Sequence, residues 1–349
     1  MFRAVRKVAK VLIKGIIGSE KTRRYRIRLL QFTSYQQQRW LLRRRGRALF
    51  NFWEHRRWED FWLWRFLNRP RLRAALADRT VAFISVFGPV EVAQRVRADV
   101  KVFFTGENLD FYPAYRNHLH ETVDFALGFD DLEASGYMRF PLWLLSCFPP
   151  DLDPEGVAAR LRQFTANRRD LLERPNMVAS LVASHDTSGI RGAIADLFGE
   201  IGEVHYGGRF RNSGSTVPPG GDFKHQFIRQ FPFQICPENS ARDGYVTEKL
   251  FQAIAAGCVP IYWGANQPPE PDILNQDAIL FYEPDRPDKL AEALRSLRDD
   301  PDKLRRFRDM PPFQPDAADR IFAYYSDLEK LFLRACNEGA PGRRKNEAR

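Results

Sequence analysis

Residues 233–265 of the chain read FQICPENSARDGYVTEKLFQAIAAGCVPIYWGA, and they give the clearest indication of the fold. Its first four residues predict a short strand, and the polar run after them predicts a loop. From Val246 on, apolar residues recur at helical spacing, and Gly257 supplies a left-handed C-cap for the predicted helix. The apolar run at residues 259–263 predicts a second strand. The stretch is therefore a complete strand-loop-helix-strand unit.

Five side chains with polar groups crowd the loop and the first helical turn of this unit. They are Glu238, Asn239, Tyr245, Glu248 and Lys249. The N-terminus of a helix favours anions, because unpaired backbone N–H groups point outward there. A lysine in the first turn therefore indicates a phosphate ligand rather than a contribution to helix stability. From these residues alone, an ordinary β-α-β unit with a solvated loop is the alternative.

Length and composition limit the class of protein. The chain has 349 residues, of which 44% are hydrophobic, and this suffices for two domains of ordinary size with buried cores. Its four cysteines are scattered without close pairs, which argues against a disulfide framework or a zinc ribbon and favours a reducing compartment. We find no run of 18 uncharged apolar residues, and the N-terminus lacks the long apolar core of a signal peptide.

The positive charge of the chain is concentrated at its N-terminus. Residues 1–47 hold fifteen Lys or Arg residues and the single acid Glu20, which gives +14 and leaves −4 of the total charge of +10 for the other 302 residues. A basic body would indicate a groove for nucleic acid, whereas an acidic body with a basic arm indicates attachment to an anionic surface. We therefore expect no nucleic-acid partner.

The basic N-terminal segment has the pattern of a membrane-surface helix. Residues 2–17 separate apolar and basic side chains onto different helical faces, and residues 20–47 interleave basic with aromatic and aliphatic side chains. On an anionic leaflet each Lys or Arg contributes about 1 kcal/mol. We expect a cytoplasmic protein held peripherally on the inner face of the membrane by residues 1–47. Packing of this arm on the rest of the chain, or nonspecific RNA binding, is the alternative.

Beyond the extension, strand-like runs alternate with helix-length connections. The predicted strands lie at residues 48–53, 80–87, 100–104, 123–129, 177–184, 203–206, 233–236, 259–263 and 278–282. Such alternation predicts parallel sheets, whose ligands sit outside the C-terminal ends of the strands.

The two halves of this pattern predict two Rossmann-like domains that face a central cleft. We place the basic extension at residues 1–47, the first domain at 48–160, the second domain at 161–325, and the end of the last helix with the tail at 326–349. Prolines flank a charged helix at residues 149–175, between the two halves. The expected fold class is α/β, with a basic amphipathic N-terminal extension.

Two further residues are candidates for chemistry. Glu107, in Thr105-Gly106-Glu107-Asn108, follows the strand at residues 100–104 and could act as a general base, with a strand-end turn as the alternative. Arg191 stands at a predicted helix start and could bind a diphosphate bidentately, with an ordinary surface arginine as the alternative. His118 and His120 are separated by one residue without an obvious third ligand, so we expect no metal site.

Residues 233–264 resemble, without a gap, the hallmark of the α-1,3-fucosyltransferase family. That hallmark runs from a Phe-x-x-x-x-Glu-Asn-Ser/Thr strand exit through Tyr-Val-Thr-Glu-Lys to a Val/Ile-Pro-Ile-Tyr-Trp-Gly strand. The Thr-Gly-Glu-Asn element and the Phe-Ala-Leu-Gly-Phe-Asp run some twenty residues later resemble the same family. The resemblance is tight over residues 100–131 and 233–264 and loose over residues 48–325.

The resemblance implies a GT-B-type fold and roles for individual residues. Glu107 is the catalytic base, and Arg191 contacts the donor phosphates. Lys249 pairs with the β-phosphate, Glu248 accepts hydrogen bonds from hydroxyls of the ribose or the sugar, and Tyr245 lines the diphosphate pocket.

The resemblance also implies substrates and partners. A bacterial-type inverting enzyme would move L-fucose from GDP-L-fucose to O3 of N-acetylglucosamine or glucose, on an oligosaccharide or glycolipid acceptor such as lipopolysaccharide O-antigen. Asn239 and Glu238 would contact the ribose or support the site. No cofactor and no divalent metal are expected to be essential. A transferase of another nucleotide sugar, or a noncatalytic membrane-associated glycan-binding protein, is the alternative.

Overall fold

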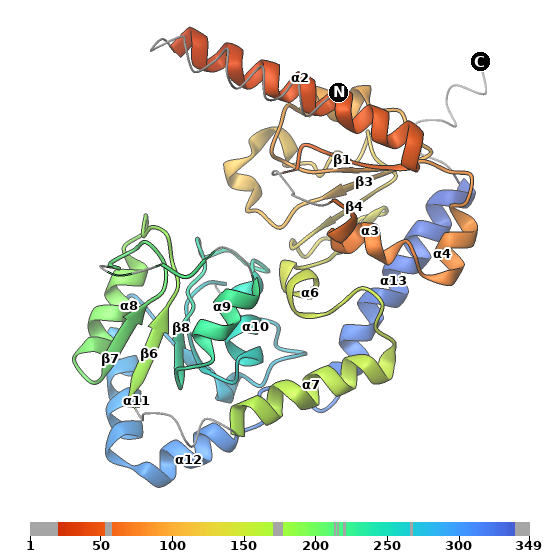
Figure 1. Ribbon diagram of the computed structural model, residues 1–349. Helices are drawn as coiled ribbons and strands as arrows, with labels where there is room; N and C mark the ends of the chain where they lie inside the picture. The colour runs from red at the N-terminus through yellow and green to blue at the C-terminus, as the bar shows by residue number, and fades with distance from the viewer. Residues whose placement is uncertain are drawn as a thin grey trace. The chain divides into compact units, whose positions relative to one another are not determined.

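The computed structural model describes residues 20–52, 58–169, 177–212, 214, 216–218, 221–265 and 268–338. The predicted helix at residues 2–17 and the tail from residue 339 lie outside the described residues. The chain divides into two compact units (Figure 1). Unit 1 consists of Met1–Gly128, Glu133–Met138 and Leu328–Arg349, and unit 2 of Phe129–Leu132 and Arg139–Asp327.

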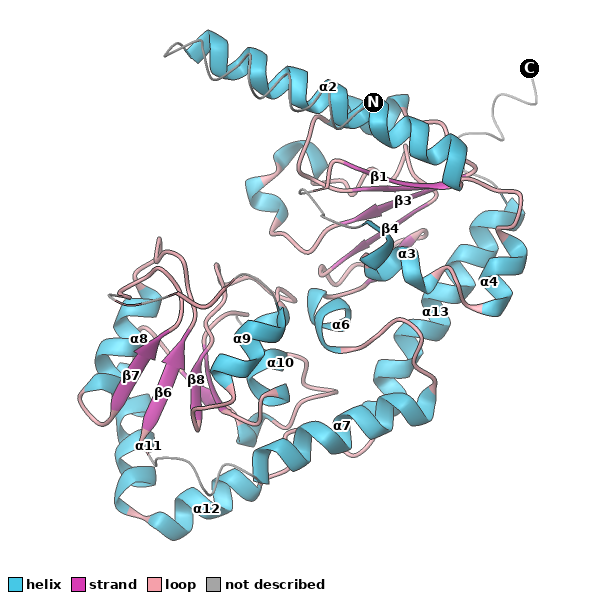
Figure 2. Ribbon diagram, in the orientation of Figure 1, coloured by secondary structure: helices cyan, strands magenta, loops and turns pink. Residues whose placement is uncertain are grey.

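Unit 1 contains a five-stranded sheet with helices on both of its faces (Figure 2). Its elements are α2 (Glu20–Arg45), β1 (Arg47–Phe50), the 3-10 turn η1 (Trp58–Asp60), α3 (Trp62–Phe66), α4 (Pro70–Ala75), β2 (Val81–Ile84), α5 (Val90–Arg95), β3 (Val100–Phe104), the 3-10 turns η2 (Leu109–Phe111) and η3 (Pro113–Tyr115), β4 (Phe125–Gly128) and β5 (Tyr137–Arg139). The strands lie in the order β1-β2-β3-β4-β5, and β1 to β4 are parallel. Strand order therefore follows chain order throughout this sheet.

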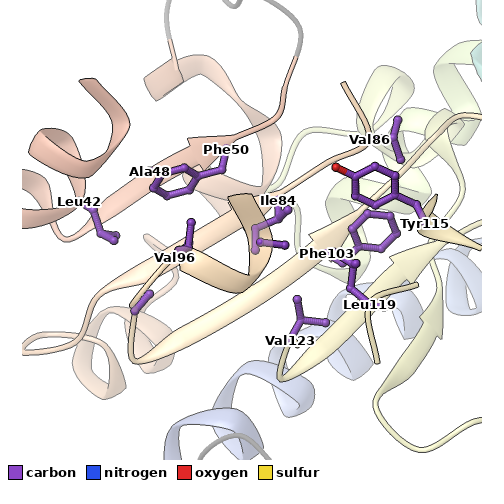
Figure 3. Close-up of a cluster of buried hydrophobic side chains, with 14 of the residues drawn as sticks. Leu42, Ala48, Phe50, Ile84, Val86, Val96, Phe103, Tyr115, Leu119 and Val123 are labelled. Carbon is purple, nitrogen blue, oxygen red and sulfur yellow. The ribbon is translucent and has the colours of Figure 1, made fainter. Parts of the chain in front are cut away.

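One face of this sheet packs against the end of α2 (Figure 3). Leu41 and Leu42 are 2% and 5% exposed and join a cluster that includes Phe50, Ile84 and Phe103 from three neighbouring strands. The last turns of the predicted basic extension therefore belong to the core of unit 1, as in the alternative in which the arm packs on the body. Membrane contact by the rest of the extension stays a prediction.

The other face of the sheet is covered by aromatic side chains, some of them from the end of the chain. Helix α13 (Ala317–Glu338) has its first half in unit 2 and its second half in unit 1. Within unit 1, the Phe332 ring centroid lies 6.3 Å from Phe83, 4.9 Å from Phe125 and 6.4 Å from Phe66. A parallel sheet is normally buried on both faces, and the end of α13 completes the second face.

Unit 2 contains a second five-stranded sheet. Its elements are α6 (Leu142–Cys147), α7 (Pro154–Arg169), β6 (Val178–Leu181), α8 (Ile190–Gly199), β7 (Glu203–Tyr206), α9 (Gly221–Ile228), β8 (Phe233–Ile235), α10 (Glu248–Ala255), β9 (Val259–Tyr262), the 3-10 turn η5 (Gln276–Ala278), β10 (Leu280–Phe281), α11 (Pro287–Asp299), α12 (Pro301–Asp309) and the first half of α13. All its strands are parallel, in the order β10-β9-β8-β6-β7.

The strand order of unit 2 reverses beside β6. The chain adds β7 on one side of β6 and then returns to place β8 on the other side. In doubly wound sheets such a reversal is the topological switch point, and ligands bind outside the strand ends there. We therefore expect a ligand-binding site at the C-terminal ends of β6 and β8.

The predicted α/β fold with two parallel sheets is confirmed, and all nine predicted strands are present. Gly257 has φ +83°, which confirms its left-handed cap, but α10 begins at Glu248, two residues after the predicted start at Val246. Strand β5 and helices α4 to α6 were not predicted, because each spans only three to six residues and shows too little periodicity. The predicted domain limits of 48–160 and 161–325 stay a prediction. Across the described residues, no helix combines the length and hydrophobicity that a membrane crossing needs.

Candidate active site

The signature segment, residues 233–264, folds as β8, a loop, α10 and β9 within unit 2 (Figure 1). The sheet pairing continues past the end of β8. Cys236 N donates to Ile261 O at 2.9 Å, and Glu238 N donates to Trp263 O at 2.8 Å. These two bonds hold the first residues of the loop beside β9, so the loop leaves the sheet only after Glu238.

Glu238 supplies an anion to the N-terminus of α10. It is 1% exposed, and its carboxylate accepts hydrogen bonds from Thr247 N at 2.7 Å, from Thr247 Oγ1 at 2.6 Å and from Lys249 Nζ at 2.8 Å. A carboxylate in this position pairs an otherwise open N–H group and complements the helix dipole. The sequence pattern predicted a phosphate ligand at this helix start, and the structure shows a carboxylate of the protein, Glu238, bonded there; the phosphate ligand stays a prediction.

A chain of alternating charges continues from Glu238 to Lys224. Lys249 Nζ also donates to Thr247 Oγ1 at 2.8 Å, and Glu248 Oε1 lies 3.8 Å from Lys224 Nζ. Burial by itself lowers the pKa of Lys249, but the charges of Glu238 and Glu248 outweigh it and raise that pKa above 10.5. Burial raises the pKa of Glu248, but the charges of Lys249 and Lys224 outweigh it and lower that pKa below 4.5. Lys249 and Glu248 are therefore both charged at neutral pH.

Arg191 is the second residue of α8 and is 8% exposed. Gly189 precedes the helix with φ +77°, and the Asp186 carboxylate accepts a bond from Arg191 N at 3.2 Å. The guanidinium donates to Asn239 Oδ1 at 2.6 Å and to the His185 carbonyl oxygen. These contacts fix the guanidinium beside the signature loop, so Arg191 and Asn239 are brought together although 48 residues separate them.

A narrow pocket lies at the switch point between β6 and β8. Its lining residues are Leu181, Val182, Arg191, Lys224, Ile228, Gln234, Ile235, Cys236, Pro237 and Lys249. Its volume is about 20 Å³, which holds about one water-sized group. Three cationic side chains from three different helices line it, so the pocket suits an oxygen of an anionic ligand.

Tyr245 is not among the residues that line this pocket. It is 3% exposed, and its ring centroid lies 4.8 Å from that of Phe129. The predicted role of Tyr245 in lining the diphosphate pocket stays a prediction; what the described contacts show is a side chain that packs the signature loop onto residues 129–132. Arg242 in the same loop forms an ion pair with Asp130 at 2.7 Å.

An ion pair between Arg139 and Glu270, here called the brace, holds the signature loop in place. Arg139 donates to Phe129 O and Gly244 O, both at 3.2 Å, and to Glu270 Oε1 and Oε2 at 2.5 and 3.0 Å. Trp143 Nε1 donates to Glu270 Oε1 at 3.0 Å. Glu270 has φ +46°, a strained backbone conformation that persists only where surrounding contacts hold it. The brace therefore fixes the position of Gly244 in the signature loop.

Glu107 lies in unit 1, on the turn that follows β3. The Thr105 hydroxyl accepts a hydrogen bond from Glu107 N at 3.0 Å, and Asn108 Oδ1 accepts one from Asp110 N at 3.0 Å. The Glu107 side chain is half-buried. Burial and the charge of Glu107 together raise the pKa of Tyr112, so the Tyr112 hydroxyl stays protonated near this carboxylate at neutral pH.

All five predicted donor-site residues lie in unit 2, and four of them lie at or next to the pocket. Arg191 and Lys249 line one pocket, Asn239 is bonded to Arg191, and Glu248 adjoins Lys249. Glu107 belongs to unit 1. Within the part of the chain that the structure describes, no group of three or more His, Cys, Asp or Glu side chains is placed to hold a metal ion.

Sequence reasoning missed three residues of this region. Lys224 lies on the predicted helix that precedes the signature strand, and no motif marks it, because its neighbours Asp222, His225 and Gln226 are polar as well. Arg139 and Glu270 gave no signal, because 131 residues separate the partners of that ion pair.

Two family descriptions match the chain. The description "Alpha-(1,3)-fucosyltransferase FucT N-terminal domain" matches residues 48–146. The description "Glycosyltransferase family 10 (fucosyltransferase) C-term" matches residues 171–311. Together they take in most strands of both sheets and every predicted site residue.

Individual relatives are more distant. The alpha-(1,3)-fucosyltransferase FucT of Helicobacter pylori is 30% identical over 190 residues, which are 47% of this chain and 37% of that protein. GDP-fucose protein O-fucosyltransferase 3 of Danio rerio is 38% identical over 88 residues, 24% of this chain and 18% of that protein. The chain thus spans well under half the length of these relatives.

A solved structure shares the fold over nearly the whole chain. It is a crystal structure of an alpha1,3-fucosyltransferase with GDP, with a TM-score of 0.57 and 21% identity. The match covers 84% of this chain and 91% of that one. It supports the architecture of two Rossmann-like sheets independently of the sequence motifs.

Proposed function

The chain belongs to glycosyltransferase family 10, the fucosyltransferases, and from this premise we propose that it is an α-1,3-fucosyltransferase that uses GDP-L-fucose. The observation that carries the proposal is the pocket at the switch point of unit 2, where Arg191 and Lys249 lie together. Doubly wound sheets bind nucleotides at this place, and fixed cations there suit a diphosphate.

On the donor side, Arg191 and Lys249 hold the diphosphate. During transfer the bond between C1 of fucose and the β-phosphate oxygen breaks, and its electron pair stays on that oxygen. Negative charge on the diphosphate therefore increases in the transition state, and cations that are already fixed in place stabilise it more than they stabilise bound donor. Glu248 accepts hydrogen bonds from donor hydroxyls, and Asn239 keeps the Arg191 guanidinium in position.

On the acceptor side, Glu107 acts as the general base. Its carboxylate accepts the proton of the attacking hydroxyl while the new bond forms between the acceptor oxygen and C1 of fucose. A single displacement of this kind inverts the configuration at C1. Because the cationic side chains offset the charge of the leaving diphosphate, the proposal includes no essential divalent metal.

The acceptor in this proposal is O3 of N-acetylglucosamine or glucose in a surface glycan such as lipopolysaccharide O-antigen. Its support is the family membership of the chain. A transferase of another nucleotide sugar is the second candidate, because the pocket lining recognises phosphate charge and carries no group specific for guanine or fucose. A noncatalytic membrane-associated glycan-binding protein is the third.

One assay separates these candidates. The purified chain is incubated with a panel of GDP-, UDP- and ADP-sugars and a small panel of oligosaccharide acceptors, and released nucleotide is measured with and without EDTA. We expect release of GDP from GDP-L-fucose alone, only with acceptor, and undiminished by EDTA. Linkage analysis of the product should then give an α-1,3 bond. Turnover of a different donor would replace the donor assignment, and no turnover of any donor would favour the binding protein.

We also propose that the N-terminal extension binds an anionic membrane surface. On the described part of α2, Phe32 and Trp40 are 60% and 45% exposed, and the Arg44 guanidinium lies 5.2 Å from the Trp40 ring centroid. Exposed aromatic residues beside basic ones suit a headgroup layer. Since Leu41 and Leu42 are core residues, the test removes only residues 1–31.

In that test, full-length and truncated chains are sedimented with vesicles of phosphatidylglycerol and of phosphatidylcholine. We expect the full chain to sediment with the anionic vesicles only and the truncated chain with neither. Equal sedimentation of both chains would remove the membrane role of the extension.

A further inference from the structure

Lys224 on α9 lies outside the signature but lines the same pocket as Arg191 and Lys249. The three side chains come from α8, α9 and α10, so the fold brings them together from separate helices. All three line a pocket with the C-terminal ends of β6 and β8, at the switch point where doubly wound sheets bind ligands. Three cations at this place favour an anionic ligand.

The charges around the pocket leave room for an anion. Glu238 is bonded to Lys249, and Glu248 lies beside Lys224, so two carboxylates face three cations. The polar contacts of the Arg191 guanidinium described above are to neutral groups, Asn239 and the backbone of His185. These three cations and two carboxylates sum to one net positive charge, and the two negative charges of a GDP-sugar diphosphate would bring that sum to −1.

The two lysines differ in how their hydrogen bonds are used. Lys249 Nζ donates to Glu238 at 2.8 Å and to Thr247 at 2.8 Å, which occupies two of its three N–H groups. Lys224 Nζ lies 3.8 Å from the Glu248 carboxylate, close enough for Coulomb attraction but too far for a direct hydrogen bond. The Glu248 carboxylate therefore attracts the Lys224 ammonium without taking up a hydrogen bond from it.

Lys224 is also partly withdrawn from water. Its side chain is 24% exposed, and burial lowers the pKa of its ammonium although Glu248 opposes the shift. A partly desolvated ammonium gains more from a phosphate oxygen than a fully hydrated one, because the local dielectric is lower. The pocket itself holds about one water-sized group, which matches one nonbridging phosphate oxygen.

We propose that Lys224 is a donor-binding residue whose ammonium contacts the β-phosphate of the nucleoside diphosphate, alongside Arg191. This inference rests on the proposed function and adds Lys224 to Arg191 and Lys249 as a third cation on the diphosphate. Lys249 also holds Glu238 and the start of α10. Because charge on the β-phosphate grows as the sugar leaves, Lys224 stabilises the leaving group as well as bound donor.

The test compares GDP with GMP, which lacks the β-phosphate. Binding of both nucleotides is measured by calorimetry for the wild type, K224M, K224Q and K224R, with K289M on the exposed face of α11 as the matched control. We expect K224M and K224Q to weaken GDP binding by about ten- to hundredfold, the worth of a charge-assisted hydrogen bond. GMP binding should change by less than about twofold, K224R should recover most of the GDP affinity, and K289M should match the wild type.

The outcomes separate this inference from the function on which it rests. Equal losses for GDP and GMP in K224M and K224Q would assign Lys224 a structural role, and unchanged GDP affinity would remove it from the site. Either result, with wild-type binding intact, overturns only the inference. A folded wild type that binds neither nucleotide overturns the proposed function and the inference together.

Discussion

The two sheets of this protein differ in how the chain threads them, and the difference decides where charged groups collect. In unit 1 the spatial order β1-β2-β3-β4-β5 is also the order of the strands along the chain, so this sheet has no switch point. In unit 2 the order β10-β9-β8-β6-β7 reverses beside β6, and the cationic pocket lies at that reversal. Connections that depart in opposite directions leave space above the strand ends, so ligand-binding groups gather in unit 2.

The acidic residues at the two sets of strand ends also differ in what holds them. Glu238 in unit 2 is 1% exposed and accepts three hydrogen bonds at the start of α10. Glu107 in unit 1 is half-buried on a turn that the Thr105 hydroxyl holds through the backbone. In unit 2, Glu238 therefore links binding and folding, whereas for Glu107 in unit 1 we expect the larger effect on catalysis.

The largest effect is expected from Glu107→Gln. Removal of a general base should lower kcat by about 10²- to 10⁴-fold, while GDP affinity and the melting temperature stay at the wild-type values. Released GDP, calorimetry and thermal unfolding measure the three quantities. A drop in melting temperature would break the comparison, because Glu107 would then belong to the fold as Glu238 does. Unchanged turnover would remove Glu107 as the base.

Glu238→Gln should instead lower stability and binding together. The substitution leaves the Lys249 ammonium buried without its carboxylate, which costs about 3–5 kcal/mol of unfolding free energy. GDP affinity should fall as well, because the start of α10 and the signature loop lose their anchor. Urea unfolding and calorimetry test both effects. Glu283→Gln, which removes an exposed partner of Lys289, serves as the control and should leave both quantities unchanged. A Glu238→Gln variant of wild-type stability would contradict the shared role.

Glycine substitutions compare the packing at the two sets of strand ends. A Cβ on Gly208 would overlap the Ala183 carbonyl just past β6, so Gly208→Ala should cost about 1–3 kcal/mol of unfolding free energy. A Cβ on Gly128, at the end of β4, would lie 3.0 Å from the Tyr137 hydroxyl, a much smaller overlap than at Gly208, so Gly128→Ala should cost less. Gly199→Ala meets nothing within 4 Å and is the control. Equal losses at Gly208 and Gly128 would show that both strand ends are packed alike.

The smallest effect is expected in the pH dependence of GDP binding. Burial lowers the pKa of Lys224 below 10.5, and only the protonated ammonium attracts phosphate. GDP affinity should therefore decline as the pH rises toward that lowered pKa, in a range where an exposed lysine is still charged. Calorimetry between about pH 7 and pH 10 measures the decline. K224R keeps its charge throughout and should give the flatter profile; identical profiles would mean that Lys224 does not titrate in the site.

Much of the fold was predictable because it depends on local patterns of apolar and polar residues. The apolar runs located all nine predicted strands, the left-handed C-cap at Gly257 was correct, and α10 was misplaced by two residues. Helix starts are less certain than helices, because the polar residues around Val246 suit a loop as well as a first turn. The basic N-terminal extension was predicted as one membrane-surface segment, yet Leu41 and Leu42 pack into the core of unit 1.

The site was predictable only in part. Arg191, Asn239, Glu248 and Lys249 were singled out because they stand in or near motifs, and their roles stay predictions. Lys224 joins them through its place on α9, which no motif marks. The brace between Arg139 and Glu270 joins residues 131 positions apart, and local patterns carry no information about such pairs.

The α/β class, the positions of the strands and the family of the chain follow from the amino-acid sequence, because each of these depends on short-range periodicity or on an ungapped motif. The strand order, and with it the switch point between β6 and β8, is visible only in the folded chain. Any apolar strand can pair with several others, and the choice is made by which arrangement buries both faces of the sheet. That choice places Lys224 and Arg191 in the lining of one pocket. It also places the Glu238 carboxylate at the N-terminus of α10, where the sequence pattern had indicated a ligand.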